Sequence, residues 1–154
     1  MELIRPDWPA PAWVRAVSTM RDGGLSSGRF ASLNLGDHVG DEPARVARNR
    51  ARLTEHLGLT AEPCWLQQVH GRTIIHADAA NPGCEADGAV TDVPGAVCVV
   101  MTADCLPLLI CDDQGTRVAA VHAGWRGLGE SVVDIGLRGR GDARCRRRVW
   151  LGRA

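Results

Sequence analysis

The chain has 154 residues, a length that fits one domain able to bury about two-thirds of its unfolded surface. Its 18 basic and 18 acidic residues cancel, so the chain as a whole lacks the strong positive charge of a nucleic-acid binder. The charge is unevenly spread, because residues 1–134 carry 11 Arg and 17 acidic residues whereas residues 135–154 carry 7 Arg and 1 acidic residue. We therefore divide the sequence into a domain at 1–134 and an Arg/Gly-rich tail at 135–154.

Cysteine usage and hydropathy indicate the compartment. The six cysteines have no regular framework spacing, and three of them, Cys98, Cys105 and Cys111, lie in or beside apolar runs. This usage favours a reducing environment. The first residues lack the apolar core of a signal peptide, and no stretch approaches the ~20 apolar residues of a membrane span. We expect a soluble, cytoplasmic protein with no membrane partner.

The first elements in chain order are a short strand, a loop and a helix. Residues 14–20 have a strand-like pattern, and the Gly-Gly and Ser-Gly pairs within 21–28 predict a loop. A helix is expected to open at Asp41, which can cap it, with Pro43 in its first turn. Gly58 is expected to end it.

The second half of the chain is expected to form a sheet. Its strands are predicted from short apolar runs at 64–69, 73–76, 96–101, 106–111 and 118–121, with a turn at 112–115. Continuous apolar runs are typical of strands that are covered on both faces. Helices should therefore cover this sheet, which gives an α/β fold.

Three motifs place a metal-binding type of side chain at the end of an apolar run. They are QQVHG (67–71), TADCLP (102–107) and VHAGWRG (121–127), and they present His70, Cys105 and His122. Because 35 and 17 residues separate these three side chains, no local zinc knuckle is possible and only the fold can bring them together. The pattern predicts an active site assembled at strand ends.

Two imidazoles and one thiolate are a known ligand set for zinc with an open fourth position, where water or substrate can bind. The same set can hold copper, with Met101 as a conceivable axial ligand. The chain has five histidines, of which this set takes two, so a multicopper centre is not supported. One metal ion is the expected cofactor.

A non-metal interpretation uses the same atoms. His70 or His122 would deprotonate Cys105, whose thiolate would attack a carbonyl, and Asp104 could orient an imidazole. Taken singly, a cysteine on a strand is often a small buried apolar residue, the favoured interpretation for Cys98 and Cys111. A lone histidine beside glycine is often a turn residue.

Several segments, in the same order, resemble the YfiH or laccase-domain family. They cover roughly residues 14–130 and comprise GGLSSG (23–28), ASLNLG (31–36), HVGD (38–41), NR (49–50), QVHG (68–71), ADGAVT (86–91), TADCLP (102–107) and HAGWRG (122–127). The resemblance implies an α/β sandwich with a mixed sheet and a metal site whose ligands match His70, Cys105 and His122.

The resemblance also implies an activity. Proteins of this family are described as purine nucleoside phosphorylases that cleave adenosine, inosine and methylthioadenosine with phosphate, and as adenosine deaminases. Other labels are polyphenol oxidase and peptidoglycan editing factor, and the latter fits a Cys-dependent hydrolase. Arg126, whose guanidinium can clamp an anion or form a salt bridge, and Arg50 become candidates for phosphate binding. Asn49 and His38 join them as substrate-binding candidates.

The C-terminal segment is expected to depart from the family. Family members run on for roughly a further third, whereas the similarity is expected to fade after Gly129. Together with the charge asymmetry, this predicts a truncated or frame-shifted copy, with an incomplete C-terminal part of the fold. A natural Arg-rich arm that binds nucleic acid, and a non-catalytic remnant, are the alternatives.

Overall fold

The computed structural model describes residues 1–77, 83–123 and 147–152. The chain divides into two compact units. One contains Met1–Arg5 and Val17–Thr60, and the other contains Pro6–Ala16 and Ala61–Ala154. No helix among the described residues is both long and apolar enough to cross a membrane.

The first unit consists of a small hairpin, a turn of 3-10 helix and one α helix. These elements are β1 (Leu3–Ile4), β2 (Ser18–Thr19), the 3-10 helix Gly28–Phe30 and α1 (Pro43–Leu57). β1 and β2 pair in antiparallel fashion. The strand predicted at 14–20 is thus reduced to two residues.

The predicted ends of α1 are close to the observed ones. Pro43 occupies the first turn, and Gly58 ends the helix in the left-handed conformation with φ 61°. The residue before the helix is Glu42, whose side chain caps nothing, so the prediction of Asp41 as the cap is wrong. Asp41 instead binds the loop that precedes the helix.

The acidity of Asp41 gives the first unit a pH-dependent stability. The Ser26 hydroxyl donates to its carboxylate at 2.6 Å, and the Asn34 amide donates at 3.0 Å. These hydrogen bonds lower the pKa of Asp41 below its ordinary 3.8. A carboxyl whose pKa falls on folding contributes stability above its unfolded pKa and loses it as the pH falls through the folded value.

We therefore expect the urea midpoint of the first unit to fall when the pH drops from 6 to below about 4. Asp41→Asn should lower the midpoint at pH 6 and shrink the difference between the two pH values. The measurement is urea unfolding followed by hydrogen exchange in residues 43–57. If Asp41→Asn showed the same pH dependence of the urea midpoint as the wild type, Asp41 would not be its cause.

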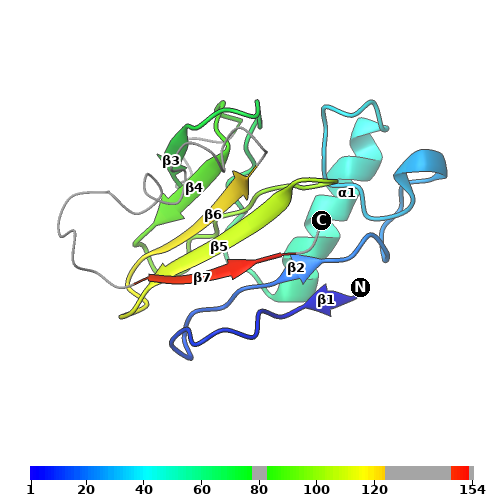
Figure 1. The fold of residues 1–154 in the computed structure, drawn as a ribbon. Coiled ribbons are helices and arrows are strands. Elements are labelled where there is room, and N and C mark those ends of the chain that lie inside the picture. The colour runs from blue at the N-terminus through cyan, green and yellow to red at the C-terminus, as the bar shows by residue number, and fades with distance from the viewer. Residues whose placement is uncertain (78–82, 124–146, 153–154) are drawn as a thin grey trace. The chain divides into compact units, whose positions relative to one another are not determined.

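The second unit is built on a five-stranded mixed sheet (Figure 1). Its strands are β3 (Ile74–His76), β4 (Gly88–Thr91), β5 (Leu106–Asp112), β6 (Val118–Ala123) and β7 (Arg147–Leu151), in the order β3-β4-β6-β5-β7. β3 and β4 are parallel and the other neighbours are antiparallel. The predicted α/β class with a mixed sheet is confirmed.

Three of the predicted strands of the second unit form. β5 and β6 form a hairpin whose turn is held by Asp112, because its carboxylate accepts hydrogen bonds from the Thr116 amide at 2.8 Å and the Thr116 hydroxyl at 2.6 Å. β3 forms within 73–76. The strands predicted at 64–69 and 96–101 are not regular strands, because these segments make only the isolated bridges Cys64↔Cys98 and Gln67↔Glu85.

Apolar side chains pack on both faces of the sheet. In the hairpin register, Leu108 lies opposite Val121 and Ile110 opposite Ala119, and all four are buried. On the other face, Ala89 belongs to a second buried cluster. Its other members are Cys64, Leu66, Ala77 and Ala86. The helical cover expected for the sheet stays a prediction, because the α helix of the described residues belongs to the first unit.

The five described cysteines of the second unit are reduced. Among the described residues, none of Cys64, Cys84, Cys98, Cys105 and Cys111 forms a disulfide. Cys111 is fully buried and Cys98 packs on the second cluster, which confirms their predicted role as small apolar core residues. Burial raises the pKa of the Cys98 thiol to about 12, so this side chain is inert at neutral pH.

Candidate metal centre

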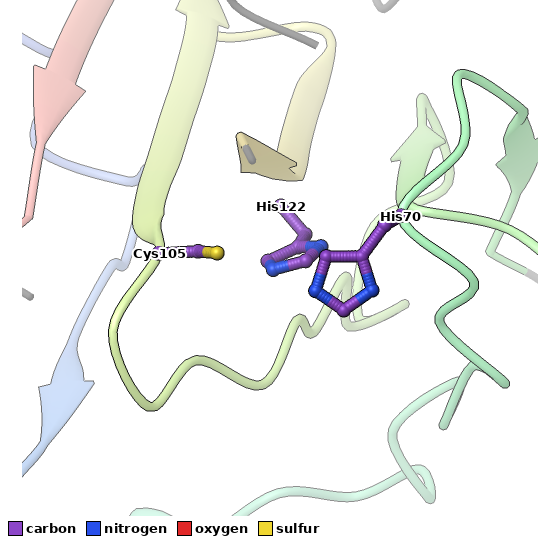
Figure 2. Close-up of side chains that lie close together, drawn as sticks. All are labelled: His70, Cys105 and His122. Atoms are coloured by element: carbon purple, nitrogen blue, oxygen red, sulfur yellow. The ribbon is translucent and has the colours of Figure 1, made fainter. Parts of the chain in front are cut away.

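The fold brings together the three predicted ligands, which we call the His-Cys-His site. One nitrogen each of His70 and His122 and the sulfur of Cys105 all lie within 4.8 Å of one another. Figure 2 shows the Cys105 side chain pointing towards the two imidazole rings. The ring centroids of His70 and His122 are 4.8 Å apart, with an interplanar angle of 78°.

The β5–β6 hairpin positions two of the predicted ligands. Cys105 immediately precedes β5, and His122 lies near the end of β6. The antiparallel register places His122 opposite Pro107, two residues after Cys105. Because the start of β5 lies beside the end of β6, the hairpin alone brings the thiol and one imidazole to the same end of these two strands.

The third ligand, His70, lies in the loop before β3 in a left-handed conformation with φ 57°. This conformation costs a residue with a side chain about 1–2 kcal/mol. The loop is held by the carboxylate of Asp87, which accepts hydrogen bonds from three successive backbone N–H groups. The distances are 3.3 Å from Val69, 2.9 Å from His70 and 2.6 Å from Gly71.

The glycine after His70 has a packing reason. A Cβ atom at position 71 would lie 3.3 Å from Oδ2 of Asp87, closer than an ordinary van der Waals contact. The backbone of this loop therefore approaches the carboxylate most easily when residue 71 has no side chain.

Asp87 also contacts the second histidine. Its Oδ1 lies 3.0 Å from Nδ1 of His122, and both side chains are almost completely buried. The His122 N–H donates to the Asp87 backbone carbonyl at 2.7 Å. A carboxylate in contact with a ligand imidazole fixes the orientation of the ring.

A side-chain amide joins the loop of His70 to the segment that leads to Cys105. The Gln68 amide donates to the Met101 carbonyl at 2.8 Å, and the Met101 N–H donates to the Gln68 side-chain oxygen at 2.7 Å. These two hydrogen bonds tie the two ligand-bearing segments together. Gln68 thus supports the site without being a ligand.

The environment of Cys105 opposes a free thiolate. Burial raises the pKa of its thiol above the ordinary 9.0, and the charge and hydrogen bonding of the neighbouring Asp104 raise it further. Asp104 is exposed and raises the pKa of Cys105, whereas Asp87 is the carboxylate that contacts the imidazole of His122. The predicted orienting role therefore belongs to Asp87 and not to Asp104.

The three side chains fit one zinc ion. Zinc binds nitrogen at about 2.0–2.1 Å and sulfur at about 2.3 Å, so a tetrahedral ion holds its ligand atoms roughly 3.3–3.7 Å apart. Atoms that lie within 4.8 Å of one another reach this spacing by small side-chain movements. His70 is exposed, so solvent reaches the site at this residue.

The predicted substrate-binding residues are not among the described residues of the second unit. Arg126 is outside the described residues. His38, Asn49 and Arg50 belong to the first unit, whereas the His-Cys-His site belongs to the second. Arg50 donates to the Leu35 carbonyl at 2.9 Å.

Asn49 and His38 have local partners. Asn49 is fully buried and binds the loop before α1, accepting a hydrogen bond from the Leu25 N–H at 2.7 Å and donating to the Asn34 carbonyl at 2.8 Å. His38 is half exposed and lies 3.7 Å from the carboxylate of Asp37.

Sequence reasoning missed Asp87 as a site residue. A signal for it was available, because Asp87 is a charged residue inside the apolar stretch 86–90. A carboxylate buried beside a strand needs hydrogen-bond partners, and metal ligands with N–H groups are such partners.

Comparison with known proteins agrees with this geometry. The model of the family described as multi-copper polyphenol oxidoreductase laccase matches residues 15–152. The chain belongs to the YfiH, or laccase-domain, family. The match extends to residue 152, so the prediction that the similarity fades after Gly129 is wrong. The boundary predicted between 134 and 135 stays a prediction, although β7 of this segment joins the five-stranded sheet.

Similar curated proteins of the YfiH family are named purine nucleoside phosphorylase. One from Pseudomonas aeruginosa is 52% identical over 151 residues, covering 98% of this chain and 61% of the relative. Another from Shigella flexneri, purine nucleoside phosphorylase YfiH, is 46% identical and covers 99% of this chain and 63% of the relative. The chain thus spans less than two-thirds of the length of these relatives.

Solved structures share the fold. The crystal structure of a Neisseria meningitidis protein superposes with a TM-score of 0.81 at 47% identity, covering 88% of this chain and 55% of that one. The structure of YlmD from Geobacillus stearothermophilus gives a TM-score of 0.74 at 34% identity, covering 84% and 52%.

Proposed function

We propose that this chain carries the metal site of a zinc-dependent purine nucleoside phosphorylase acting on adenosine, inosine and methylthioadenosine. The observation that supports it is the convergence of His70, Cys105 and His122 in a chain whose relatives are named purine nucleoside phosphorylase. Adenosine deamination at the same site is part of the proposal, because it needs a water activated beside a purine carbon.

The residues at the site have different roles in this proposal. His70, Cys105 and His122 would hold a zinc ion, which would supply Lewis acidity. His122 is buried against Asp87 and stays fixed, whereas His70 is exposed and borders the side from which a nucleoside approaches. In phosphorolysis, a phosphate oxygen bonds to the anomeric carbon as the glycosidic bond breaks, and the purine leaves with a proton.

Phosphate requires a cationic partner. Arg126 and Arg50 remain the proposed phosphate ligands, with Asn49 and His38 as further substrate-binding residues, because a guanidinium fork matches the geometry of phosphate oxygens. A purine nucleoside and phosphate are therefore the proposed small-molecule partners of the chain.

The chemistry of Cys105 supports a ligand role over a nucleophilic one. A hydrolase that edits a peptidoglycan precursor would need a reactive thiolate, which a lowered pKa favours. The pKa of Cys105 is raised by burial and by Asp104. A metal ion offsets this effect, because it binds the thiolate form.

The test is an assay of the zinc-loaded full chain with inosine and phosphate. We expect hypoxanthine and ribose 1-phosphate, formed only when both zinc and phosphate are present. Adenosine without phosphate should give inosine and ammonia. Chelation should abolish both reactions, and zinc should restore them.

The assay separates the competing functions. Activity on a cell-wall precursor that survives chelation but is lost on alkylation of Cys105 would replace the proposal with a thiol hydrolase. Absence of ribose 1-phosphate from folded, zinc-loaded protein would refute phosphorolysis by this chain.

A further inference from the structure

Asp87 is a buried carboxylate outside the proposed ligand set that contacts both histidines of it. It precedes β4, with no exposed surface, and extends the β4–β6 register by one residue so that it lies opposite His122. Its backbone carbonyl accepts the His122 N–H at 2.7 Å, and its Oδ1 lies 3.0 Å from the ring Nδ1. The backbone and side-chain contacts together fix the distance between the carboxylate and the imidazole.

The hydrogen bonds of Asp87 determine which ring nitrogen of His122 carries hydrogen. Oδ1 accepts the N–H of His70 at 2.9 Å, and Oδ2 accepts that of Gly71 at 2.6 Å. A carboxylate surrounded in this way acts as an acceptor, so its contact with Nδ1 is satisfied when Nδ1 carries the hydrogen. Nε2 of a neutral His122 then keeps its lone pair for a metal ion.

The same carboxylate stabilises the unusual backbone of His70. Three successive N–H groups, those of residues 69–71, converge on it, and the central residue has φ 57°. Such a run of converging N–H groups is an anion-binding arrangement, here occupied by a side chain of the same chain. Without the carboxylate, the left-handed conformation of His70 would lose its main polar support.

We propose that Asp87 is the positioning residue of the His-Cys-His site, which it preforms by setting the tautomer of His122 and the backbone of His70. The inference rests on the metal-binding part of the proposed function and not on its substrate. A single buried side chain thereby prepares both imidazoles for the ion, while Gln68 joins the loop of His70 to the segment that leads to Cys105.

The test uses the metal-free full chain labelled with ¹⁵N-histidine. We expect NMR to show His122 as the Nδ1–H tautomer, the minor form of free histidine. In Asp87→Ala, the Nε2–H tautomer should appear, and zinc affinity, measured by competition with a chelator, should fall about 10–100-fold. Asp104→Asn is the matched control, because this carboxylate neighbours Cys105; it should leave the His122 tautomer unchanged.

A second variant covers the case in which Asp87→Ala does not fold. Asp87→Asn keeps one carbonyl oxygen for Nδ1 of His122 but places an amide group among the N–H groups of residues 69–71. We expect it to retain the Nδ1–H tautomer, to lose hydrogen-exchange protection at Gly71, and to bind zinc more weakly than the wild type.

An Nε2–H tautomer in the wild type would overturn the proposal. Zinc affinity within about twofold of wild type in both Asp87 variants would also overturn it, because loss of a residue that orients a metal ligand typically lowers metal affinity about 10–100-fold. Neither readout uses enzyme activity, so absence of phosphorolysis would refute the proposed reaction and leave the role of Asp87 to be decided by these measurements.

Discussion

Replacing Cys105 by serine is expected to remove zinc from the His-Cys-His site and to reduce phosphorolysis to background. A serine hydroxyl is a poor ligand at neutral pH, and two imidazoles alone leave the ion weakly held. The loss of affinity should exceed the 10–100-fold that is typical of removing an outer partner. Cys105 is only partly buried, so the variant should melt close to the wild-type temperature.

Cobalt substitution makes this prediction specific. Co²⁺ bound to a thiolate gives a charge-transfer absorption band that should be present in the wild type and absent from Cys105→Ser. Cys98→Ser is the matched control, because Cys98 lies in the same unit and contacts the Val118 carbonyl at 3.8 Å, away from the site. A cobalt band that persists in Cys105→Ser would show that this sulfur is not a ligand.

Replacing Asn49 by aspartate is expected to destabilise the first unit by about 3 kcal/mol or more. The Asn49 amide donates to Ser26, Ser32 and Asn34 in a fully buried position. Aspartate has the same shape but would bury a negative charge against two backbone carbonyl oxygens. Such an unpaired buried charge is among the most destabilising changes a single substitution makes.

Urea unfolding and hydrogen exchange in residues 43–57 measure this loss, with Arg48→Ala, exposed on the same helix, as the control. Cobalt binding by the second unit should be retained, because all three ligands belong to that unit. Full stability combined with lost turnover would instead assign Asn49 to substrate binding.

The elements that could be predicted from sequence are those whose causes are local. Proline is tolerated in the first turn of a helix and glycine adopts the left-handed end, so Pro43 and Gly58 mark α1 within one or two residues. The β5–β6 hairpin follows from two apolar runs separated by a turn with Asp112 at its start. These signals need no knowledge of the rest of the fold.

The segments at 64–69 and 96–101 show where local signals are insufficient. Both are apolar: Cys64 and Leu66 of the first segment are buried, and Cys98 and Val100 of the second are partly buried against them. A regular strand also needs a neighbouring strand that pairs with it through continuous hydrogen bonds. These segments make only isolated bridges. Pairing over long sequence separations depends on tertiary context, which hydrophobic pattern does not encode.

The meeting of the three metal-binding side chains could be predicted, but the carboxylate that supports them could not. His70, Cys105 and His122 are chemically distinctive residues at the ends of apolar runs, and they meet as expected. Asp87 lies between alanine and glycine in a buried stretch, and its role depends on the register of β4 with β6. Asp87 can be read from the sequence, but its contact with His122 cannot, because that contact depends on how the strands pair.

The β5–β6 hairpin has an evolutionary consequence. Successive side chains of a strand point to opposite faces, so an insertion of one residue within β6 would turn His122 away from Cys105 and Asp87. An insertion in the turn at 113–116 leaves the pairing of Pro107 with His122 intact. Length variation compatible with the metal site should therefore accumulate at the tip of the hairpin, whereas the two strands should keep their spacing across the family.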